Sequence, residues 1–375
     1  MKVIPFYLPQ FHRIPENDEW WGDGFTEWSN VKAAKPLFEG HEQPRIPLGH
    51  NYYDLSSVDT LIWQADLAKN FNIHGFCFYH YWFDGKLLLE RPMELLRDNP
   101  QIDLNYMISW ANENWTNGWV SDDNKVLIGH HASDPNLWVE HFDYLASFFK
   151  DPRYIREDGK PLLAIYVPHH IRYLDEMLDV WDSRAAELGI PGIKYIYQHP
   201  SAHGASNVNK ARFSYGIEFQ PQYQERQNKS KASKFLQRWI PMISGWLQSN
   251  FGVYLRLPSR QTAVTKIDYD DAWHNILTRA PAAPNLIPSG FVGWDNTPRK
   301  GHRGSVYTGG SPEKFGRYFK RLITKAKNEY PTSYVFLFAW NEWAEGGYLE
   351  PDEANGFGYL EAIRDAVASE LPDFE

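Results

Sequence analysis

Short hydrophobic runs alternate along the chain with longer stretches in which apolar residues recur at helical spacing. This alternation is typical of a parallel β-sheet whose strands are joined by crossover helices, and near-continuous hydrophobic runs indicate strands that are covered on both faces. Eight strands are expected, at Val3–Leu8, His74–Tyr81, Leu104–Trp110, Leu162–Val167, Lys194–Gln198, Gly216–Gln220, Gly290–Trp294 and Tyr334–Trp340. They predict an α/β fold of the (β/α)8 TIM-barrel type, a single domain over residues 1–375 with elaborated loops after the strands.

Helical periodicity fills four stretches between the expected strands. They are Ser56–Asn70, Leu137–Phe149, Leu174–Leu188 and Pro312–Asn328. Ser311 is the expected N-cap of the last helix, with Pro312 at its first position. The basic, irregular segment 222–284 carries two further expected helices, Lys231–Trp239 and Tyr269–Ala280. It is interpreted as a loop and helical insertion in the barrel, not as a second domain.

Tryptophan lies beside carboxylates, amides or histidine directly after five of the expected strands. Because the C-terminal ends of barrel strands form one face, and that face carries the active site of barrel enzymes, these side chains are expected to meet in one cavity. The expected substrate-binding residues are His12, Trp28, His80, Tyr81, Trp82, Trp110, Asn112, Glu113, Trp115, Trp294, Asn341 and Trp343. Packing alone gives no reason for their concentration at one end of the strands.

Two glutamates, Glu342 and Glu345, follow the last expected strand. Cleaving a glycosidic bond needs a proton donor for the leaving oxygen and a second carboxylate that acts as nucleophile or base. Both glutamates can reach one cavity, where repulsion and burial would raise at least one pKa. They are the expected catalytic residues, and the alternative that one caps a helix or pairs with arginine stays open. Glu113 is expected to bind sugar hydroxyls or to pair with a basic residue.

Weaker candidates of the same kind are Glu27, Asp84 and Asp295. The basic loop Arg299–Arg303 is interpreted as a solvated turn, with an anion or substrate contact as the alternative. Aromatic residues make up 16% of the chain, with 16 tryptophans. Some of them must form the core, but rings beside hydrogen-bonding groups also suit sugars, whose C–H faces stack on aromatics. An oligosaccharide or polysaccharide is therefore the expected partner.

Charge and missing motifs narrow the function further. The formal net charge is −9, with acidic and basic residues mixed, so no nucleic-acid partner is expected. The single cysteine, Cys77, excludes a disulfide within the chain, and no apolar run approaches a membrane span. No metal-ligand spacing, phosphate-cradling glycine loop or serine nucleophile elbow is visible, so neither metal nor cofactor is expected. Met1–Pro9 is interpreted as a first strand, not a signal peptide, which predicts a cytoplasmic location.

Longer motifs resemble one known family, the WbsX-like proteins. The motifs are Phe6–His12, Glu16–Gly22, Gly24–Trp28, Lys35–Phe38, Gly75–Phe83, Trp110–Trp115 and Trp340–Pro351. The resemblance extends over nearly the whole chain, and segment 222–284 is its least familiar part. Members of that family are often found with bacterial surface-polysaccharide genes and are described as glycosyltransferases. They are also similar to glycoside hydrolase family 99, the endo-α-1,2-mannosidases and mannanases.

Family 99 carries an Asn-Glu-Trp-x-Glu motif on its last strand, which Asn341, Glu342, Trp343 and Glu345 match. The resemblance implies that Glu342 deprotonates the sugar 2-hydroxyl, whose attack on the anomeric carbon gives a 1,2-anhydro sugar. It makes Glu345 the general acid/base at the leaving oxygen, with retention of configuration and no metal. The short N-terminus departs from secreted or Golgi-anchored members, which favours a role in cytoplasmic glycan assembly or trimming.

Three functions stay open. The favoured one is a retaining, family 99-like glycoside hydrolase, endo-acting on an α-linked polysaccharide or oligosaccharide. A glycosyltransferase of O-antigen or capsule biosynthesis would need a nucleotide diphosphate site, usually an Asp-x-Asp motif with a metal or a glycine-rich fold, and neither is visible. A non-catalytic glycan-binding barrel is the third, because a fold does not fix a function. Binding alone could use amides in place of Glu342 and Glu345, which argues against it.

Overall fold

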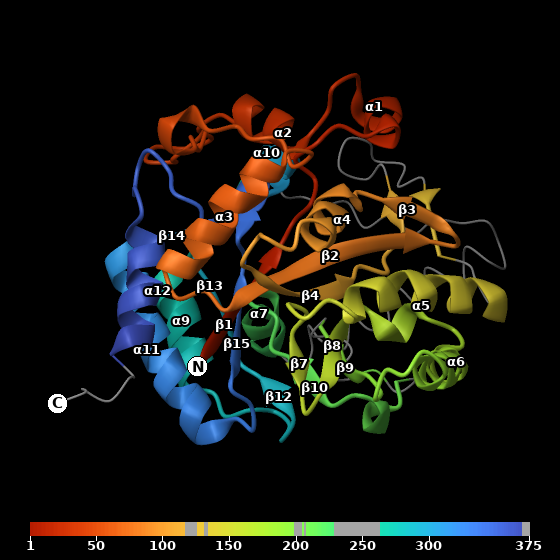
Figure 1. The fold of residues 1–375 in the computed structure, drawn as a ribbon. Coiled ribbons are helices and arrows are strands. Elements are labelled where there is room, and N and C mark those ends of the chain that lie inside the picture. The colour runs from red at the N-terminus through yellow and green to blue at the C-terminus, as the bar shows by residue number, and fades with distance from the viewer. Residues whose placement is uncertain (117–125, 131–133, 199–204, 206–207, 229–262, 370–375) are drawn as a thin grey trace, which may run out of the picture.

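The computed structural model describes residues 1–116, 126–130, 134–198, 205, 208–228 and 263–369. Parallel strands form a barrel with helices packed around its outside (Figure 1). The barrel strands are β1 (Lys2–Tyr7), β2 (Gly75–Phe83), β4 (Asn105–Trp110), β8 (Lys160–Ile165), β9 (Lys194–Tyr197), β10 (Tyr215–Ile217), β12 (Leu286–Ile287), β13 (Ser289–Phe291) and β15 (Tyr334–Phe338). Their hydrogen-bonded order is β12-β10-β9-β8-β4-β2-β1-β15-β13.

Nine strand segments make a ring of eight strands because one strand is interrupted. Pro288 alone separates β12, which pairs with β10, from β13, which pairs with β15. Proline has no backbone N–H to donate, so it breaks the ladder. The two ends of the strand order are therefore halves of one strand, and the ring closes. The predicted (β/α)8 fold is confirmed, and each of the eight expected strands overlaps an observed one.

The remaining elements lie outside this ring. The α-helices are α1 (Pro15–Trp21), α2 (Glu27–Ala33), α3 (Val58–Asn70), α4 (Arg91–Asp98), α5 (Pro135–Phe149), α6 (Leu174–Glu187), α7 (Gln222–Asn228), α9 (Tyr269–Thr278), α10 (Thr297–Lys300), α11 (Pro312–Glu329) and α12 (Gly358–Ala368). The short strands are β3 (Lys86–Leu88), β5 (Trp115–Thr116), β6 (Val126–Ile128), β7 (Arg156–Glu157), β11 (Thr265–Asp268), β14 (Ser305–Thr308), β16 (Asn341–Glu342) and β17 (Gly347–Tyr348). Most barrel strands are thus followed by a helix, as a parallel sheet requires.

The helices predicted from periodicity are present as α3, α5, α6 and α11. Ser311 caps α11 as expected, because its hydroxyl accepts the backbone N–H of Lys314. In segment 222–284, the expected helix Tyr269–Ala280 is α9, and Lys231–Trp239 lies outside the described residues. The interpretation of this segment as an insertion stays a prediction.

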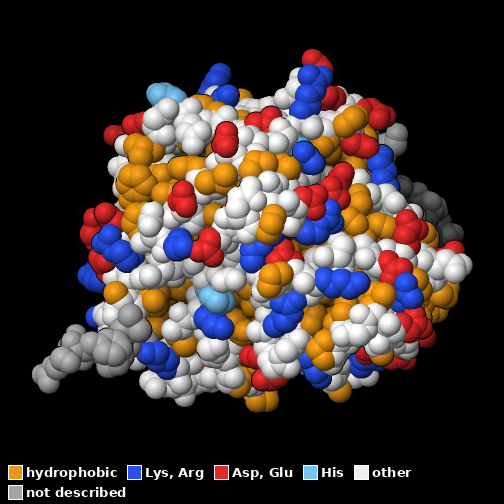
Figure 2. Space-filling model, in the orientation of Figure 1, with side chains coloured by type: hydrophobic (Ala, Val, Ile, Leu, Met, Phe, Trp, Pro, Cys, Tyr) orange, Lys and Arg blue, Asp and Glu red, His pale blue; other side chains and the backbone are white. Residues whose placement is uncertain are grey.

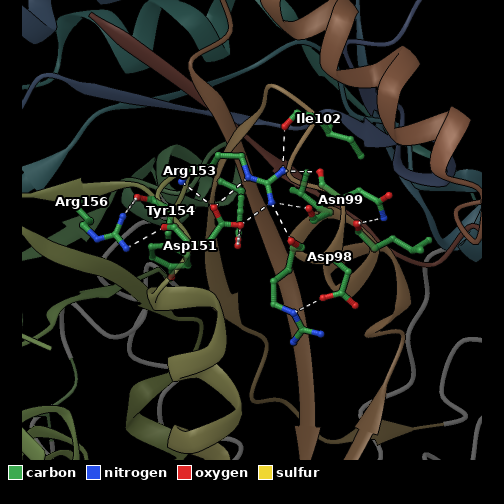
Figure 3. Close-up of polar contacts among 11 residues, drawn as sticks. Asp98, Asn99, Ile102, Asp151, Arg153, Tyr154 and Arg156 are labelled. Atoms are coloured by element: carbon green, nitrogen blue, oxygen red, sulfur yellow. Dashed lines mark hydrogen bonds and ion pairs between the residues drawn. The ribbon is translucent and has the colours of Figure 1, made fainter. Parts of the chain in front are cut away.

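Arg153 ties together the N-terminal ends of β4 and β8 (Figure 3). Its guanidinium donates to four backbone carbonyls at the end of α4 and in the loop before β4, those of Leu96, Arg97, Asn99 and Ile102. It also donates to both carboxylate oxygens of Asp151, at 3.0 and 2.6 Å. Carbonyls at a helix end lack partners within the helix, so one side chain satisfies several of them and fixes this end of the barrel.

Aromatic rings fill the barrel interior. Phe6 of β1 contacts Tyr79, Phe219 and Phe336 with ring centroids 5.1 to 5.6 Å apart. On the surface shown in Figure 2, acidic and basic side chains are interspersed. Within the described part of the chain, no helix has the length and apolar character that crossing a bilayer requires. The cytoplasmic location and the absence of a nucleic-acid partner stay predictions.

Candidate active site

A cavity of about 1060 Å³ lies at the C-terminal ends of the strands. This volume is at the upper end of the range for ligand sites, roughly 300–1,000 Å³. Nine of the residues predicted from sequence as catalytic or binding residues line it: Tyr81, Trp82, Trp110, Asn112, Glu113, Trp115, Trp294, Glu342 and Glu345. The residues come from the ends of β2, β4, β13 and β15, so the barrel brings together side chains that lie far apart in sequence.

Arg299, in α10, contacts three carboxylates at one side of this cavity. Its Nη1 donates to Glu345 at 2.7 Å, its Nη2 to Glu342 at 3.2 Å, and its Nε to Glu27 at 3.2 Å. The arginine side chain is 6% exposed and that of Glu27 is fully buried. The interpretation of this part of the loop as a solvated turn is therefore wrong for Arg299. The pairing with arginine that the sequence left open is present, and it joins both predicted catalytic glutamates.

The Glu342 carboxyl holds its proton more tightly than an ordinary glutamate. Burial raises its pKa from 4.5 to about 8; the neighbouring Glu345 and Glu27 add repulsion, and Arg299 opposes the rise. One guanidinium cannot neutralise three carboxylates, so a proton on Glu342 lowers the charge of the cluster at neutral pH. Desolvation also raises the pKa of Glu113, an exposed residue that lines the cavity.

A tight turn after β15 places the two glutamates. Glu342 ends β16, and Glu345 ends the single 3₁₀ turn that follows. The backbone N–H of Asp295 donates to the carbonyl of Glu345 at 2.6 Å, which holds the turn against the loop after β13. Gly346 then has a φ of +63°, and a Cβ there would lie 2.8 Å from the backbone nitrogen of Asp295. Only glycine combines that backbone conformation with so close an approach.

Asp295 also holds the helix that carries Arg299. Its carboxylate accepts the backbone N–H and the hydroxyl of Thr297 at the start of α10, and the side-chain amide of Gln43. His41 Nε2 lies 2.8 Å from the same carboxylate. Although burial opposes ionisation, these hydrogen bonds and the charge of Arg45 hold the pKa of Asp295 below its usual value. Asp295 thus supports both the arginine and the turn of Glu345, and it does not line the cavity.

A second buried carboxylate, Glu350, supports the same turn from another side. It accepts hydrogen bonds from the Tyr53 hydroxyl, from Gln64 Nε2 and from the indole of Trp343, at 2.9, 2.7 and 2.7 Å. Burial raises the pKa of Glu350 to about 7, while these donors act in the opposite direction. Because Trp343 lies between the two predicted catalytic residues in sequence, this cluster fixes the spacing of Glu342 and Glu345.

Three tyrosines, Tyr79, Tyr81 and Tyr166, line the cavity near Glu342. Burial raises the pKa of each hydroxyl, and the negative charge of Glu342 adds to the effect. They therefore remain protonated and can donate hydrogen bonds to ligand oxygens. Sugar recognition needs such donors in addition to stacking faces.

Five predicted binding residues do not line the cavity: His12, Trp28, His80, Asn341 and Trp343. Asn341 instead accepts the backbone N–H of Leu8 at 2.7 Å and donates to its carbonyl at 2.9 Å. The ring of Trp343 stacks on Tyr348 with centroids 3.7 Å apart and also contacts Trp28. His12 is buried, and His80 contacts His141. These contacts support the walls of the site, and a direct ligand contact for the five residues stays a prediction.

Sequence reasoning missed Tyr79, Tyr166 and His141 as site residues, and it ranked Arg299 and Glu27 low. Tyr166 lies in an expected strand end, so a signal was present in its position. His141 is on α5, where a lone histidine in an apolar helix face gives no sequence signal. Among the described residues, no group of three or more His, Cys, Asp or Glu side chains is arranged to hold a metal ion. The expected absence of metal and cofactor stays a prediction.

Known proteins resemble this chain in sequence over nearly its full length. The sequence model of the family described as Glycosyltransferase WbsX matches residues 3–363. The protein WxcX of Xanthomonas campestris pv. campestris is 34% identical over 375 residues, which cover 99% of this chain and 50% of the relative. The protein of the same name from strain B100 matches equally well. The chain therefore spans about half the length of the curated relatives it matches.

Solved structures resemble it in fold. The GH99 endo-alpha-mannosidase from Bacteroides thetaiotaomicron superposes with a TM-score of 0.54 at 15% identity, covering 98% of this chain and 96% of the other. A structure described as a glycoside hydrolase-like protein gives 0.55 at 12% identity, covering 91% and 98%. At these identities the likeness shows a shared barrel fold.

The strand order and the structural neighbours define the class of fold first: this is a TIM barrel like that of the GH99 structures. The chain belongs to the WbsX glycosyltransferase family, because the family model matches all but its first two and last twelve residues. The resemblance to WbsX-like proteins that the motifs predicted is therefore confirmed.

Proposed function

We propose that this chain is a retaining glycoside hydrolase of the family 99 type, endo-acting on an α-linked oligosaccharide or polysaccharide. The observation that carries the proposal is that Glu342 and Glu345 line one cavity together with Trp110, Trp115 and Trp294. Paired carboxylates supply the acid and the base of glycosidic cleavage, and aromatic rings supply stacking faces for sugars. The structural likeness to an endo-alpha-mannosidase supports the choice of an α-linked substrate.

In this proposal Glu342 takes the proton of the sugar 2-hydroxyl. The resulting oxygen attacks the anomeric carbon, so a 1,2-anhydro sugar forms as the bond to the leaving oxygen breaks, and Glu345 donates its proton to that oxygen. Water then attacks the anomeric carbon, giving a proton to Glu345, and the 2-oxygen takes its proton back from Glu342. Arg299 contacts both carboxylates and holds them on one side of the cavity.

The pH dependence of kcat/KM distinguishes Glu342 acting as a base from Glu342 acting as the proton donor. A base must be ionised in the free enzyme, and the pKa of Glu342 is about 8. We therefore expect kcat/KM to have a rising limb that follows the ionisation of Glu342 near pH 8 and that disappears in Glu342→Gln, since kcat/KM reports groups of the free enzyme. If Glu342 were the proton donor, kcat/KM would fall through the same range. A falling profile that disappears in Glu342→Gln would contradict the proposed roles.

The decisive experiment is a screen of purified protein against defined α-linked manno-, rhamno- and fuco-oligosaccharides. Products are followed by mass spectrometry, and the anomeric configuration of the first product is read by proton NMR. We expect internal cleavage of at least one substrate with retention, and 2-deoxy or 2-O-methyl analogues of it should resist cleavage. Inversion, or equal cleavage of the 2-deoxy analogue, would rule out participation by the 2-hydroxyl.

The family description favours a glycosyltransferase as the second candidate. Running the same screen with nucleotide sugars and sugar acceptors tests it directly. Product that forms only when a nucleotide sugar is present would favour the transferase. Glycan binding without turnover under either condition would favour a non-catalytic barrel.

A further inference from the structure

The cavity extends far from the two glutamates. In the ring of eight strands, β8 stands four positions from β15 in either direction, so the loops after these strands face each other across the barrel. The glutamates follow β15, while α6 and the loop before it follow β8, and α5 follows β4. We call the part of the cavity formed by α5, α6 and this loop the α5–α6 end. Its lining residues include Leu137, Trp138, His141, Ile171, Tyr173 and Met177, together with the exposed His170 and Arg172.

Apolar side chains dominate the α5–α6 end. Leu137 and Ile171 are half-buried, and Met177 and Trp138 are buried. The adjacent Arg172 also lines the cavity, but its side chain is exposed and lies over the ring of Tyr173, 5.2 Å from the centroid. A plain sugar ring would place several hydroxyls here with few partners, and an unpaired polar group costs about 1–3 kcal/mol when it is buried.

One buried polar group interrupts this apolar wall. His141 lines the cavity, and its Nε2 lies 2.9 Å from Nε2 of His80. Both rings are neutral, because burial lowers the pKa of His80 to about 3 and that of His141 well below its usual value. One nitrogen of the pair must therefore donate and the other accept. The ring of His141 also stacks on Trp82, with centroids 4.8 Å apart, so its orientation is fixed.

The surroundings of His80 decide which nitrogen donates. Nδ1 of His80 is buried without a hydrogen-bond partner among the described residues. If His80 accepted, its proton would lie on Nδ1 as a buried, unpaired N–H, and orphaned donors of this kind are rarer than orphaned acceptors. His80 is therefore the donor, His141 accepts at Nε2, and the proton of His141 lies on Nδ1. Nδ1 of His141 is thus an N–H donor in a part of the described cavity wall that is otherwise mostly apolar.

We infer that the α5–α6 end binds a sugar unit that carries an acylamino group. An acylamino group combines a carbonyl, which accepts one hydrogen bond, with a methyl group, which needs an apolar surface. The carbonyl would accept from Nδ1 of His141, and the methyl group would contact Leu137, Ile171 and Met177. This inference rests on the proposed function, because it takes the cavity to hold a glycan chain that reaches across the barrel from Glu342 and Glu345.

Ligand-observed NMR on the whole protein tests the inference without requiring turnover. The probes are methyl glycosides of N-acetylglucosamine and N-acetylgalactosamine, each compared with the parent sugar that carries a hydroxyl in place of the acetamido group. We expect the acetamido methyl to receive the strongest saturation transfer and at least one acetamido probe to bind about tenfold more tightly than its parent. Equal affinities, or no detectable binding of either acetamido probe, would overturn the inference.

Two pairs of variants locate the binding. Ile171→Gln should weaken the acetamido probe about tenfold and leave the parent sugar unchanged, because losing contact with about two methylene groups is worth roughly that factor. Ile62→Gln is the matched control, since Ile62 is exposed on α3. His141→Asn keeps an N–H donor near Nδ1 and should retain part of the preference, whereas His141→Leu should abolish it. Thermal melting confirms that each variant is folded before its affinity for the probes is measured.

The outcomes separate this inference from the proposed function. Acetamido selectivity in a wild-type protein that hydrolyses none of the α-linked substrates would support the α5–α6 end and argue against the hydrolase. Retaining hydrolysis with identical kcat/KM for acetamido and hydroxyl substrates, unchanged by Ile171→Gln, would support the hydrolase and overturn the inference.

Discussion

Arg153 and Arg299 are largely enclosed arginines at opposite ends of the barrel, with side chains 12% and 6% exposed, and they differ in the charge of their partners. Arg153, at the N-terminal ends of the strands, contacts four neutral carbonyls and the single carboxylate of Asp151. Arg299, at the C-terminal ends, contacts three carboxylates. The first set leaves no net charge in the cluster, whereas the second leaves an excess of negative charge, which a proton on Glu342 reduces.

The difference in partner charge shows how arginine can stabilise one end of a barrel and hold titratable groups at the other. A guanidinium with balanced partners rigidifies the chain, and nothing in its surroundings titrates near neutral pH. A guanidinium shared by too many acids holds groups whose protonation changes easily, which is what acid–base chemistry requires. The division matches the general rule that the bottom face of a barrel carries stability and the top face carries function.

The largest effect is expected from the two glutamates at the Arg299 end. Glu345→Gln should lower turnover of natural glycosides by about 10²- to 10⁴-fold, yet retain more activity on substrates whose leaving group needs no protonation. Glu342→Gln should be impaired on both kinds of substrate, because attack by the 2-hydroxyl is required either way. Initial rates on the two substrate types measure this. Normal turnover by Glu342→Gln would contradict the proposed mechanism.

At the other end, Arg153→Met should lower the free energy of unfolding by about 3–5 kcal/mol, since it leaves Asp151 and several carbonyls without their partner. Urea unfolding followed by circular dichroism measures the loss. Activity below the melting transition should stay unchanged. Arg299→Met is the mirror variant: it leaves three carboxylates without their cation, so it should lose activity as well as stability. Normal activity of Arg299→Met, or lost activity of Arg153→Met below its melting transition, would erase the distinction between the two ends.

The pH dependence of stability should reveal the excess acid at the Arg299 end. The folded protein holds the Glu342 proton up to about pH 8, whereas the unfolded chain releases it near 4.5. Stability contributed by this group is therefore complete below pH 4.5 and is lost as the pH rises to 8. Wild type should lose more stability than Glu342→Gln between pH 5 and pH 8. Parallel curves from urea unfolding would show that Glu342 does not carry this proton.

The smallest effect concerns the support of Arg299. Thr297→Val removes the hydroxyl that donates to Asp295 at 2.6 Å and keeps the shape of the side chain. We expect a loss of about 0.5–1.5 kcal/mol of stability, the usual value for one hydrogen bond, and a fall in kcat with little change in KM. Thr324→Val on the exposed face of α11 is the matched control. A variant with unchanged kcat would show that Asp295 holds α10 without this bond.

The fold could be predicted from the sequence because barrel strands have a simple signature. Each of the eight strands is a hydrophobic run covered on both faces, and such runs stand out between amphipathic helices. The site could be predicted in part for a related reason: polar residues directly after such runs must lie on one face. Glu342, Glu345, Trp110 and Trp115 all follow this rule, and each lines the cavity.

Sequence position alone could not separate the lining of the cavity from the layer that supports it. Asn341 and Glu342 are adjacent, yet Asn341 bonds to the backbone of Leu8 while Glu342 lines the cavity. Side-chain direction at a strand end depends on the turn that follows. Asp295, which is distant in sequence, holds that turn, and so does Glu350, two of whose donors, Tyr53 and Gln64, are distant in sequence. Arg299 could not be assigned either, because its partners come from two segments that are far from it in sequence, Glu27 and the turn of Glu342 and Glu345.

The closure of the ring has a consequence for how the protein is made. The amide of Asn341 bonds to the backbone of Leu8, 333 positions away, and β1 pairs with β15 along the same seam. At a synthesis rate of roughly 5–20 residues per second, Asn341 is added roughly 17 to 67 seconds after Leu8. The very apolar edge of β1 is unpaired on that side throughout the interval. Among the described barrel strands, the seam that places the turn of Glu342 and Glu345 is thus the last to be completed. A nascent chain stalled before β15 would be exposed to aggregation or chaperone capture there.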